Sequence, residues 1–453
     1  MDTKTQRYDR QLRLWQASGQ MALESAHVCL VNGTATGTEI LKNLVLPGIG
    51  AYTVVDPART TGADVGNNFF LRVEDIGEHR AAATCALLAE LNPDVEKHAY
   101  ATHTVAELLA PEAAAMFDAF TMVVAVDVPE ADLLALAARC WQTQKPLVVV
   151  RVCGFFGYLR VVGPEHTVVD THPDHMADLR LYAPFPALLE YAARFESMDT
   201  MSNADHGHVP YVVILLKYLE QFRMKHGRLP GNYQEKNELK TMIRAGMRAS
   251  DEENFHEAMD AVLRSCTKPE IPSSIQALFN DPACEQLTPQ SSNFWILLRA
   301  MRDFTASSQG AGLLPLSGTL PDMKSDTENY VALQQIYRQK AQADCHAVHD
   351  HVRQHLARLH LPSDRIGDEE VAAFCKHAAF LQVIRYRSLA DEYVDNPPTE
   401  QLTNELADPS SEAIRYVMFR AAEQFYEQYQ RYPGKVAAAS MQHNIHMCIS
   451  IAV

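Results

Sequence analysis

Residues 27–37 read HVCLVNGTATG, a short apolar run followed directly by a polar, glycine-containing loop. The run at 27–31 is rich in β-forming residues and lacks apolar–polar alternation, which is typical of a strand buried on both faces. Beyond the loop, apolar residues recur at helical spacing over 40–45 and stop at Pro47-Gly48, a pair that ends helices. This order of strand, loop and helix predicts the opening unit of a parallel α/β sheet.

The same alternation continues on the C-terminal side of this unit. Strand-like runs occupy 51–56, 121–126 and 146–152, and helical stretches lie between them around 81–91 and 131–140. Strands without alternation that are separated by amphipathic helices predict a parallel sheet covered on both faces. We therefore expect a doubly wound, Rossmann-like α/β domain over residues 1–165, in which 155–162 is one more strand or a crossover.

From Asp178 onward the pattern changes to long helices. Stretches with helical periodicity and few strand signals lie at 211–222, 252–264, 294–304, 330–356, 369–386 and 412–429. Segments rich in Pro and Gly separate them. We expect a second, mainly helical domain over residues 166–434, which is within the usual size range of a domain.

Composition excludes several classes of function. A formal net charge of -16 argues against binding to nucleic acid or to anionic lipid, because both carry negative charge themselves. No apolar run approaches the roughly 20 residues that a membrane helix needs. The chain has nine cysteines and no C-x-x-C pair, which favours reduced thiols in the cytoplasm or nucleus over a disulfide framework.

The loop after the first strand departs from an intact phosphate-binding turn. Such a turn uses three glycines, for the tight turn, for close approach of phosphate, and for packing of the helix on the sheet. When Gly37 is aligned to the third glycine, Asn32 and Thr34 fall at the first two positions. Asn32 tolerates the positive φ of the turn, whereas Thr34 places a β-branched side chain where phosphate would approach. The pattern predicts a fold that is kept and a nucleotide site that is degenerate.

Asp56 has two interpretations. It ends the second predicted strand, about 20 residues beyond the loop, where an acid binds a ribose hydroxyl in intact sites. Alternatively, it caps the turn that follows the strand. The degraded loop favours the second interpretation.

Four stretches of the sequence resemble a known family: residues 7–15, which read RYDRQLRLW, and residues 25–31, 37–50 and 66–80. These stretches resemble enzymes that activate ubiquitin-like proteins and their bacterial adenylating relatives. Further motifs resemble one branch of that family, the regulatory subunits of neddylation-activating enzymes: NNFFL at 67–71, HPD at 172–174, PFP at 184–186, IPSSI at 271–275, FWIL at 294–297 and RYPG at 431–434. The resemblance implies a ThiF/MoeB-like adenylation fold, joined to a helical domain that is similar to a catalytic-cysteine domain without its cysteine.

The resemblance also implies that several nucleotide-site positions hold residues other than those of the active members. Active members supply an arginine and a neighbouring amide to ATP, and these two places hold Asn67 and Asn68 here. Asparagine lacks the permanent charge and the five donors of arginine. The family's lysine falls at Arg80, and Asp127 falls where active members keep a nucleotide-site aspartate. The resemblance therefore implies that this chain binds no cofactor and that ATP and Mg²⁺ are held by a partner subunit.

Arg10 is the one residue to which the resemblance assigns a catalytic contribution. In this family an arginine at that position reaches across a pseudo-twofold dimer to the ATP of the partner. Adenylation builds negative charge on the phosphates, and a preorganised cation stabilises it. The alternative is a solvated arginine on the surface of an N-terminal helix.

The function implied is that of the regulatory, non-catalytic subunit of a heterodimeric enzyme that activates a ubiquitin-like modifier. The partners implied are the catalytic subunit, the modifier and, transiently, a conjugating enzyme. Two rival hypotheses are an NAD(P)-dependent oxidoreductase, against which Asn32 and Thr34 argue, and a pure protein-binding adaptor. The adaptor hypothesis differs only in giving Arg10 no catalytic role.

Other candidate residues have simpler interpretations. Cys284 in a Pro-x-Cys setting is predicted to be an ordinary loop thiol rather than a nucleophile, and Cys29 and Cys153 are predicted to be core residues. A Cys and several His at 345–355 have spacings that can hold a metal. They lack a second ligand pair at matched spacing, as does the pair His206 and His208, so no metal site is predicted.

The C-terminus departs from the family after Gly434. Residues 435–453 form a divergent tail, where relatives continue through a segment that completes the helical domain and returns to the adenylation fold. Without that segment we expect uncovered apolar surface. A truncated isoform or a misread gene model is our hypothesis for the tail.

Overall fold

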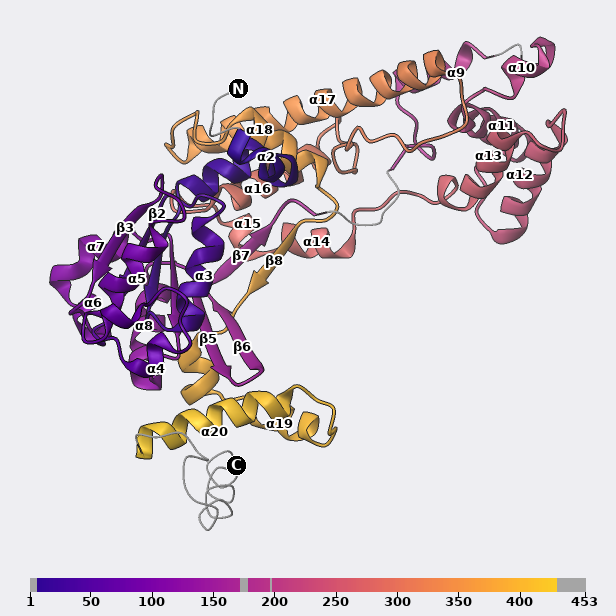
Figure 1. The fold of residues 1–453 in the computed structure, drawn as a ribbon. Coiled ribbons are helices and arrows are strands. Elements are labelled where there is room, and N and C mark those ends of the chain that lie inside the picture. Colours follow the sequence, from indigo (N-terminus) through magenta and orange to yellow (C-terminus); the bar gives the residue numbers. More distant parts are fainter. Residues whose placement is uncertain (1–5, 172–177, 196–197, 430–453) are drawn as a thin grey trace. The chain divides into compact units, whose positions relative to one another are not determined.

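The computed structural model describes residues 6–171, 178–195 and 198–429, and the divergent tail predicted at 435–453 lies outside them. The chain divides into two compact units (Figure 1). The first contains the residues up to His166 together with those from Arg385 onward, and the second contains Thr167–Ile384. The sequence analysis placed 166–434 in one domain, so the assignment of the residues after Ile384 differs. The reason is long-range packing, since Leu389 lies in a core cluster with the sheet strands.

The first unit is built on a six-stranded sheet of order β3-β2-β1-β4-β5-β6. Its strands are β1 (His27–Val31), β2 (Ala51–Val55), β3 (Glu96–Tyr100), β4 (Met122–Val126), β5 (Leu147–Cys153) and β6 (Phe156–Val162). The first five pair in parallel, and β6 returns antiparallel to β5. The predicted doubly wound sheet is confirmed, and the segment at 155–162 is a strand rather than a crossover.

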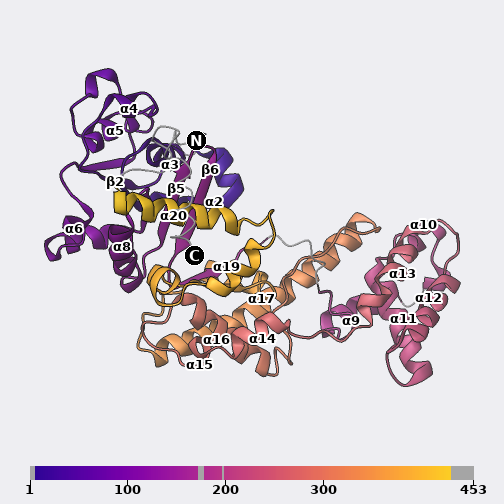
Figure 2. The same cartoon turned by 90° about the horizontal axis from the view of Figure 1, so that it is seen from below.

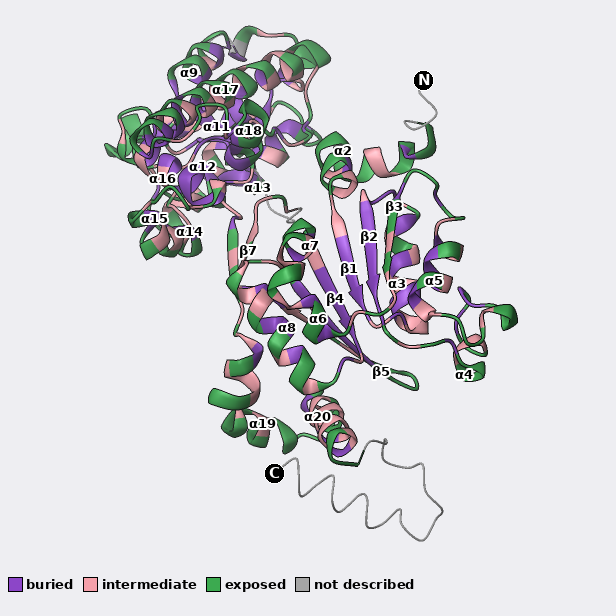
Figure 3. Cartoon of the chain, turned by 90° about the vertical axis from the view of Figure 1, so that its left-hand side faces the viewer, coloured by how far each residue is buried: buried purple, intermediate pink, exposed green. Residues whose placement is uncertain are grey.

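Helices cover both faces of this sheet, which explains why its strands lack alternation. In β1, Cys29 and Val31 belong to the core under α6 (Val105–Leu108), α7 (Ala114–Ala119) and α8 (Glu130–Gln142). The intervening Val28 and Leu30 belong to the opposite core, under α3 (Ala35–Val45) and α5 (Arg80–Leu88). Successive side chains of a strand point to opposite faces, so all four positions from Val28 to Val31 are apolar. Figure 3 shows the buried interior of the sheet.

The second unit is mainly helical and has two core clusters. Its helices are α9 (Pro186–Ala193), α10 (Asn203–His206), α11 (Tyr211–His226), α12 (Tyr233–Ala245), α13 (Glu253–Ser265), α14 (Ser273–Phe279), α15 (Pro282–Glu285), α16 (Asn293–Ala306), α17 (Thr327–Arg358) and α18 (Asp368–Lys376). The 32-residue helix α17 contributes Leu333 and Tyr337 to the cluster with α11 and α13, and Val348 and Val352 to the cluster with α16 and α18 (Figure 2). One helix therefore belongs to both cores.

The chain returns to the first unit after β8 (Gln382–Arg385), which pairs with β7 (Glu165–Val168) in a separate two-stranded sheet. A π-helical turn at Asp391–Asp395 and the helices α19 (Thr399–Leu406) and α20 (Ala413–Tyr429) follow. The N-terminal helix α2 spans Asp9–Glu24. Among the described residues, no helix is long and apolar enough to span a membrane.

Candidate functional site

The loop between β1 and α3 lies at the carboxyl end of the sheet, where β1 has β2 on one side and β4 on the other. Ligands of such folds bind at this point, where the strand order reverses. Asn32 has a φ of 75°, the left-handed conformation expected of it, and its side-chain amide donates to the Val126 carbonyl at 2.8 Å. A Cβ on Gly37 would lie 2.9 Å from the Asn32 carbonyl oxygen. Gly37 therefore meets the packing requirement of the third glycine, and Asn32 supplies the turn.

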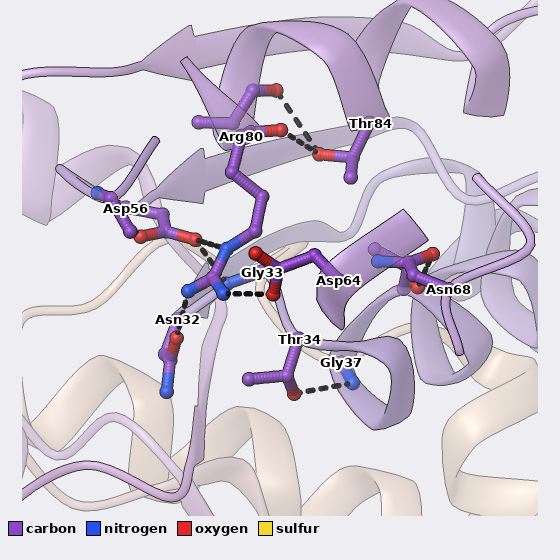
Figure 4. Close-up of polar contacts among 12 residues, drawn as sticks. Asn32, Gly33, Thr34, Gly37, Asp56, Asp64, Asn68, Arg80 and Thr84 are labelled. Carbon is purple, nitrogen blue, oxygen red and sulfur yellow. Dashed lines mark hydrogen bonds and ion pairs between the residues drawn. The ribbon is translucent and has the colours of Figure 1, made fainter. Parts of the chain in front are cut away.

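The hydroxyl of Thr34 caps the N-terminus of α3. Thr34 is the N-cap residue, and its Oγ1 accepts from the Gly37 N–H at 3.4 Å (Figure 4). Free amides at a helix N-terminus are what makes such a position bind anions. In this loop the Thr34 hydroxyl accepts the hydrogen bond of one of those amides. Fewer backbone N–H groups are therefore left to bind a phosphate.

Arg80, the first residue of α5, fills the space in front of the loop. Its Nε donates to Asp56 Oδ2 at 2.6 Å, its Nη1 to Asp64 Oδ1 at 2.9 Å and its Nη2 to Asn32 Oδ1 at 2.7 Å (Figure 4). The side chain is only 12% exposed. Burial alone would lower the pKa of Arg80, but Asp56 and Asp64 hold it above its ordinary value. The guanidinium is therefore committed to three partners within the chain.

Both oxygens of Asp56 are also committed. Oδ1 accepts from the Ala58 N–H at 2.9 Å, which caps the turn after β2, and Oδ2 accepts from the Gly33 N–H at 3.0 Å as well as from Arg80. With its side chain only 2% exposed, Asp56 is largely inaccessible to a ribose hydroxyl. Of the two interpretations left open above, the geometry favours the turn cap.

Two residues of this network escaped the sequence analysis. Asp64 pairs with Arg80. Gly33 packs against Asp56, because a Cβ added at this position would lie 3.2 Å from Asp56 Oδ2. A signal for Asp64 was available, because Thr61 and Asp64 form a capping box that begins the short helix α4 (Gly62–Val65). Burial raises the pKa of Asp64, but its hydrogen bonds with Thr61 and Arg80 outweigh burial and lower it.

The two asparagines at 67 and 68 do not form a joint binding position. Asn67 is exposed, whereas Asn68 is buried. The Asn68 Oδ1 accepts from the Phe70 N–H at 2.9 Å and from the Thr38 hydroxyl at 3.0 Å. Asn68 thus ties the loop to α3, and neither residue provides the positive charge that active relatives are expected to place here.

Asp127 lies at the end of β4 and lines a cavity of about 230 Å³. Its Oδ1 accepts from the Val152 N–H at 3.3 Å, and burial raises its pKa. The cavity is also lined by Asn32, Val128, Pro129, Glu130, Arg151, Glu423, Tyr426 and Glu427. Since three of these residues belong to α20, the C-terminal part of the first unit forms one of the cavity walls.

An ion-pair network joins α20 to β5 and to the start of α8. Arg151 of β5 is buried, and it donates to Glu423 and to the Val128 carbonyl. Arg420 pairs with Glu130 at 2.7 Å and with Glu423 at 3.4 Å. Burial raises the pKa of Glu423, against the opposing effect of the two arginines. The sequence analysis missed this network, and no local spacing could have indicated it, because Arg151 and Glu423 are 272 positions apart.

Arg10 lies in the first turn of α2 and is exposed. Within the described part of the chain it forms no ion pair, whereas Arg7 pairs with Asp94 and Arg13 with Asp9. The helix itself is anchored by Tyr8, whose hydroxyl accepts from Asn92 Nδ2 at 2.9 Å. An arginine that is accessible on a fixed helix can serve a second molecule.

Among the cysteines singled out from the sequence, two predictions were wrong. Cys284 is fully buried in the second unit's core rather than a loop thiol, and burial raises its pKa to about 11. Cys153, predicted to be a core residue, is exposed because it lies at the end of β5 beside the β5–β6 turn. Cys29 is buried as predicted. A buried, protonated thiol such as Cys284 is a poor nucleophile.

Four of the histidines singled out from the sequence have partners within the chain. His349 pairs with Asp368 at 3.0 Å and His355 with Asp303 at 2.7 Å, so these two histidines contact different carboxylates. His206 pairs with Glu252 at 2.6 Å, and His208 is bonded to the Ala204 carbonyl. The described residues contain no group of three His, Cys, Asp or Glu side chains arranged to hold a metal ion.

Comparison with known proteins places these features in context. The ThiF family model matches residues 8–186. A NEDD8-activating enzyme E1 regulatory subunit of Xenopus laevis is 44% identical over 95% of this chain and 82% of its own length. The Arabidopsis thaliana protein named NEDD8-activating enzyme E1 regulatory subunit AXL is 38% identical, with the same coverage. The solved structure of the E. coli tRNA N6-threonylcarbamoyladenosine dehydratase TcdA is 21% identical, with a TM-score of 0.30 over 33% of this chain and 61% of that one.

Proposed function

We propose that this chain, which belongs to the family of NEDD8-activating enzyme E1 regulatory subunits, holds no nucleotide and leaves ATP and Mg²⁺ to a catalytic partner subunit. Membership in this family makes it the regulatory subunit of an enzyme that activates a ubiquitin-like modifier for protein neddylation. The observation that supports the assignment of ATP and Mg²⁺ to the partner subunit is the network of bonds around Arg80. Arg80 lies in front of the loop, with Asp56, Asp64 and Asn32 as its partners.

Two further features support an empty site. Phosphate would have to displace the Thr34 hydroxyl from the Gly37 amide, and ribose would have to displace Gly33 or Arg80 from Asp56. Breaking a buried charge pair without replacing it costs about 3–5 kcal/mol. A nucleotide would therefore bind here much more weakly than in a site whose donors are free.

Arg10 gives the chain a direct part in the reaction of its partner. We assign it the stabilisation of negative charge on the phosphates of ATP bound to the catalytic subunit. Its exposure and its lack of an ion pair with described residues support this role, since a cation already paired within the chain would be less available. A preorganised cation acts on the charge that develops in the transition state.

The remaining partners follow from the same role. The ubiquitin-like modifier would be adenylated at the partner's site and then linked to the partner's cysteine, and a conjugating enzyme would receive it. The helical unit contributes surface and not a nucleophile, in keeping with the buried Cys284. We infer that its function is to shape the groove in which these proteins meet.

The proposal is tested with this chain and the catalytic subunit, each alone and together. ATP binding is measured by calorimetry, and adenylation by ATP–pyrophosphate exchange in the presence of the modifier. We expect this chain alone to show neither, and the complex to exchange faster than the catalytic subunit alone. ATP binding or exchange by this chain alone would refute the proposal. Binding of NAD(P) would support the rival oxidoreductase hypothesis.

A further inference from the structure

The start of α2 is fixed by one buried tyrosine. Tyr8 immediately precedes the helix and is 3% exposed, whereas Arg10 lies two residues later and is exposed. The Tyr8 hydroxyl accepts from Asn92 Nδ2 at 2.9 Å, and the same amide donates at 3.0 Å to the carbonyl of Val45, the last residue of α3. The helix therefore begins at a point that is tied to the body of the first unit.

The turn after α3 contacts α2 just before and just after Arg10. Gly48 has a φ of 87°, and a Cβ at this position would lie 2.5 Å from the Tyr8 hydroxyl oxygen. The tyrosine thus occupies the space that a side chain at position 48 would need. The residue after Arg10, Gln11, donates from Nε2 to the Pro47 carbonyl at 3.0 Å. In the sequence, Arg10 lies between these two anchors.

The side chain of Arg10 has no such anchor. Among the described residues its guanidinium forms no hydrogen bond or ion pair, whereas that of Arg7 donates to Asp94 at 2.7 Å. A cation that stabilises the charge of a transition state must be in place before the reaction, and a misplacement of about 1 Å can lower a rate roughly 100-fold. With no bond of its own, the Arg10 guanidinium depends on the backbone from which it projects.

We propose that Tyr8 is a positioning residue for the adenylation reaction of the assembled enzyme. Through its hydrogen bond with Asn92 and its fit against Gly48, it sets where the backbone of Arg10 stands relative to the first unit. Arg10 then meets the phosphates of the ATP on the catalytic subunit from a fixed base. The inference rests on the role proposed above for Arg10, because the buried Tyr8 acts only through that residue.

A purely structural role for Tyr8 makes a different prediction. Loss of its hydroxyl would then lower the stability of the first unit and leave the rate of each assembled complex unchanged. Tyr52 provides the matched control, because it is fully buried in the same unit and its hydroxyl donates to the Cys85 carbonyl at 3.3 Å. That bond joins β2 to α5 and involves no residue of α2.

The test compares Tyr8→Phe with Tyr52→Phe, each assembled with the catalytic subunit. ATP–pyrophosphate exchange is measured per assembled complex in the presence of the modifier. We expect Tyr8→Phe to lower kcat between about 3-fold and about 30-fold, part of the roughly 100-fold loss expected for Arg10→Ala, with little change in KM for ATP. Tyr52→Phe should stay within about 2-fold of the unmodified enzyme. Equal kcat values for the two variants would overturn the proposal.

A double-mutant cycle tests whether Tyr8 acts through Arg10. In the Arg10→Ala background, Tyr8→Phe should have no further effect on kcat, because the group that it positions is gone. The same fold loss in both backgrounds would overturn the proposal while leaving the role of Arg10 intact. An unchanged rate in Arg10→Ala alone would refute the role of Arg10, and this inference with it.

Asn92→Ala removes the same hydrogen bond from the other side and should lower kcat by a similar factor. It decides the question where Tyr8→Phe does not fold. Hydrogen exchange of the free chain gives a readout without the partner, since a loosened anchor should accelerate exchange in the first turn of α2. Unchanged exchange there in both Tyr8→Phe and Asn92→Ala would contradict the positioning role.

Discussion

The Nε of Arg80 donates to Asp56 Oδ2 at 2.6 Å, and this ion pair joins the start of α5 to the end of β2. Asp56 is 2% exposed and Arg80 is 12% exposed, so the pair is largely removed from water. The arginine therefore has a structural role within the chain. Its importance can be measured by removing one partner.

Arg80→Met should destabilise the first unit by about 3–5 kcal/mol, because Asp56 would remain buried without its cation. The free energy of unfolding is measured from hydrogen exchange of the β1 and β2 amides in increasing urea. Arg13→Ala is the matched control, since its pair with Asp9 is exposed, and should change stability by about 0.5 kcal/mol or less. Equal effects of the two substitutions would contradict the structural role of Arg80.

Arg10→Ala should slow adenylation by the assembled enzyme while leaving the fold intact. The loss of one preorganised cation corresponds to about 3 kcal/mol, or roughly a 100-fold lower rate of ATP–pyrophosphate exchange. Arg13→Ala, on the same exposed helix, should have little effect on this rate. An unchanged rate in Arg10→Ala would instead favour a pure adaptor.

Gly37→Ala should destabilise the first unit by about 1–3 kcal/mol, because the new methyl group overpacks against backbone. Its Cβ would lie 2.9 Å from the Asn32 carbonyl oxygen and 3.0 Å from Leu30. Gly62→Ala is the control, since a Cβ there would meet no atom within 4 Å. Thermal unfolding of the two variants provides the comparison, and a Gly37→Ala protein as stable as Gly62→Ala would contradict the packing argument.

Glu423→Gln should loosen α20. Arg151 is 5% exposed, and a glutamine amide could still accept its hydrogen bond but would leave the buried guanidinium without the negative charge that it pairs with. We expect hydrogen exchange in α20 to accelerate while that in β1 changes less. Glu412→Gln removes an exposed pair with Arg415 and is the control. Unchanged protection of α20 in Glu423→Gln would show that the ion pair does not hold the helix.

Acid should weaken the second unit through Asp303. Burial raises its pKa, but His355 and Arg299 outweigh burial and hold it below the ordinary 3.8. For a carboxyl with a lowered folded pKa, the stabilisation is full above the unfolded value and disappears as pH falls through the folded value. We therefore expect Asp303→Asn to flatten the loss of stability below about pH 4, measured by urea titration at several pH values. Asp260→Asn, an exposed residue of α13, should leave the profile unchanged.

Much of the first unit could be predicted from the sequence because its determinants are local. Runs such as 28–31 and 122–126 are apolar at every position, and only a sheet covered on both faces buries such a strand completely. The left-handed turn at Asn32 and the close packing at Gly37 follow from which residues those backbone positions tolerate. Periodicity likewise revealed the long helix α17 to within a few residues of its ends.

By itself, then, the sequence determined that a doubly wound sheet forms and that its first turn departs from a phosphate-binding pattern. Only the tertiary structure decided what occupies that space. The bonds from Arg80 reach residues 24, 16 and 48 positions away, and the contact of Arg151 with Glu423 spans 272 positions. It also decided that the chain after Ile384 belongs with the first unit. The physical reason is that charge pairing and burial depend on which groups share a space, and no periodic pattern in the sequence records that proximity.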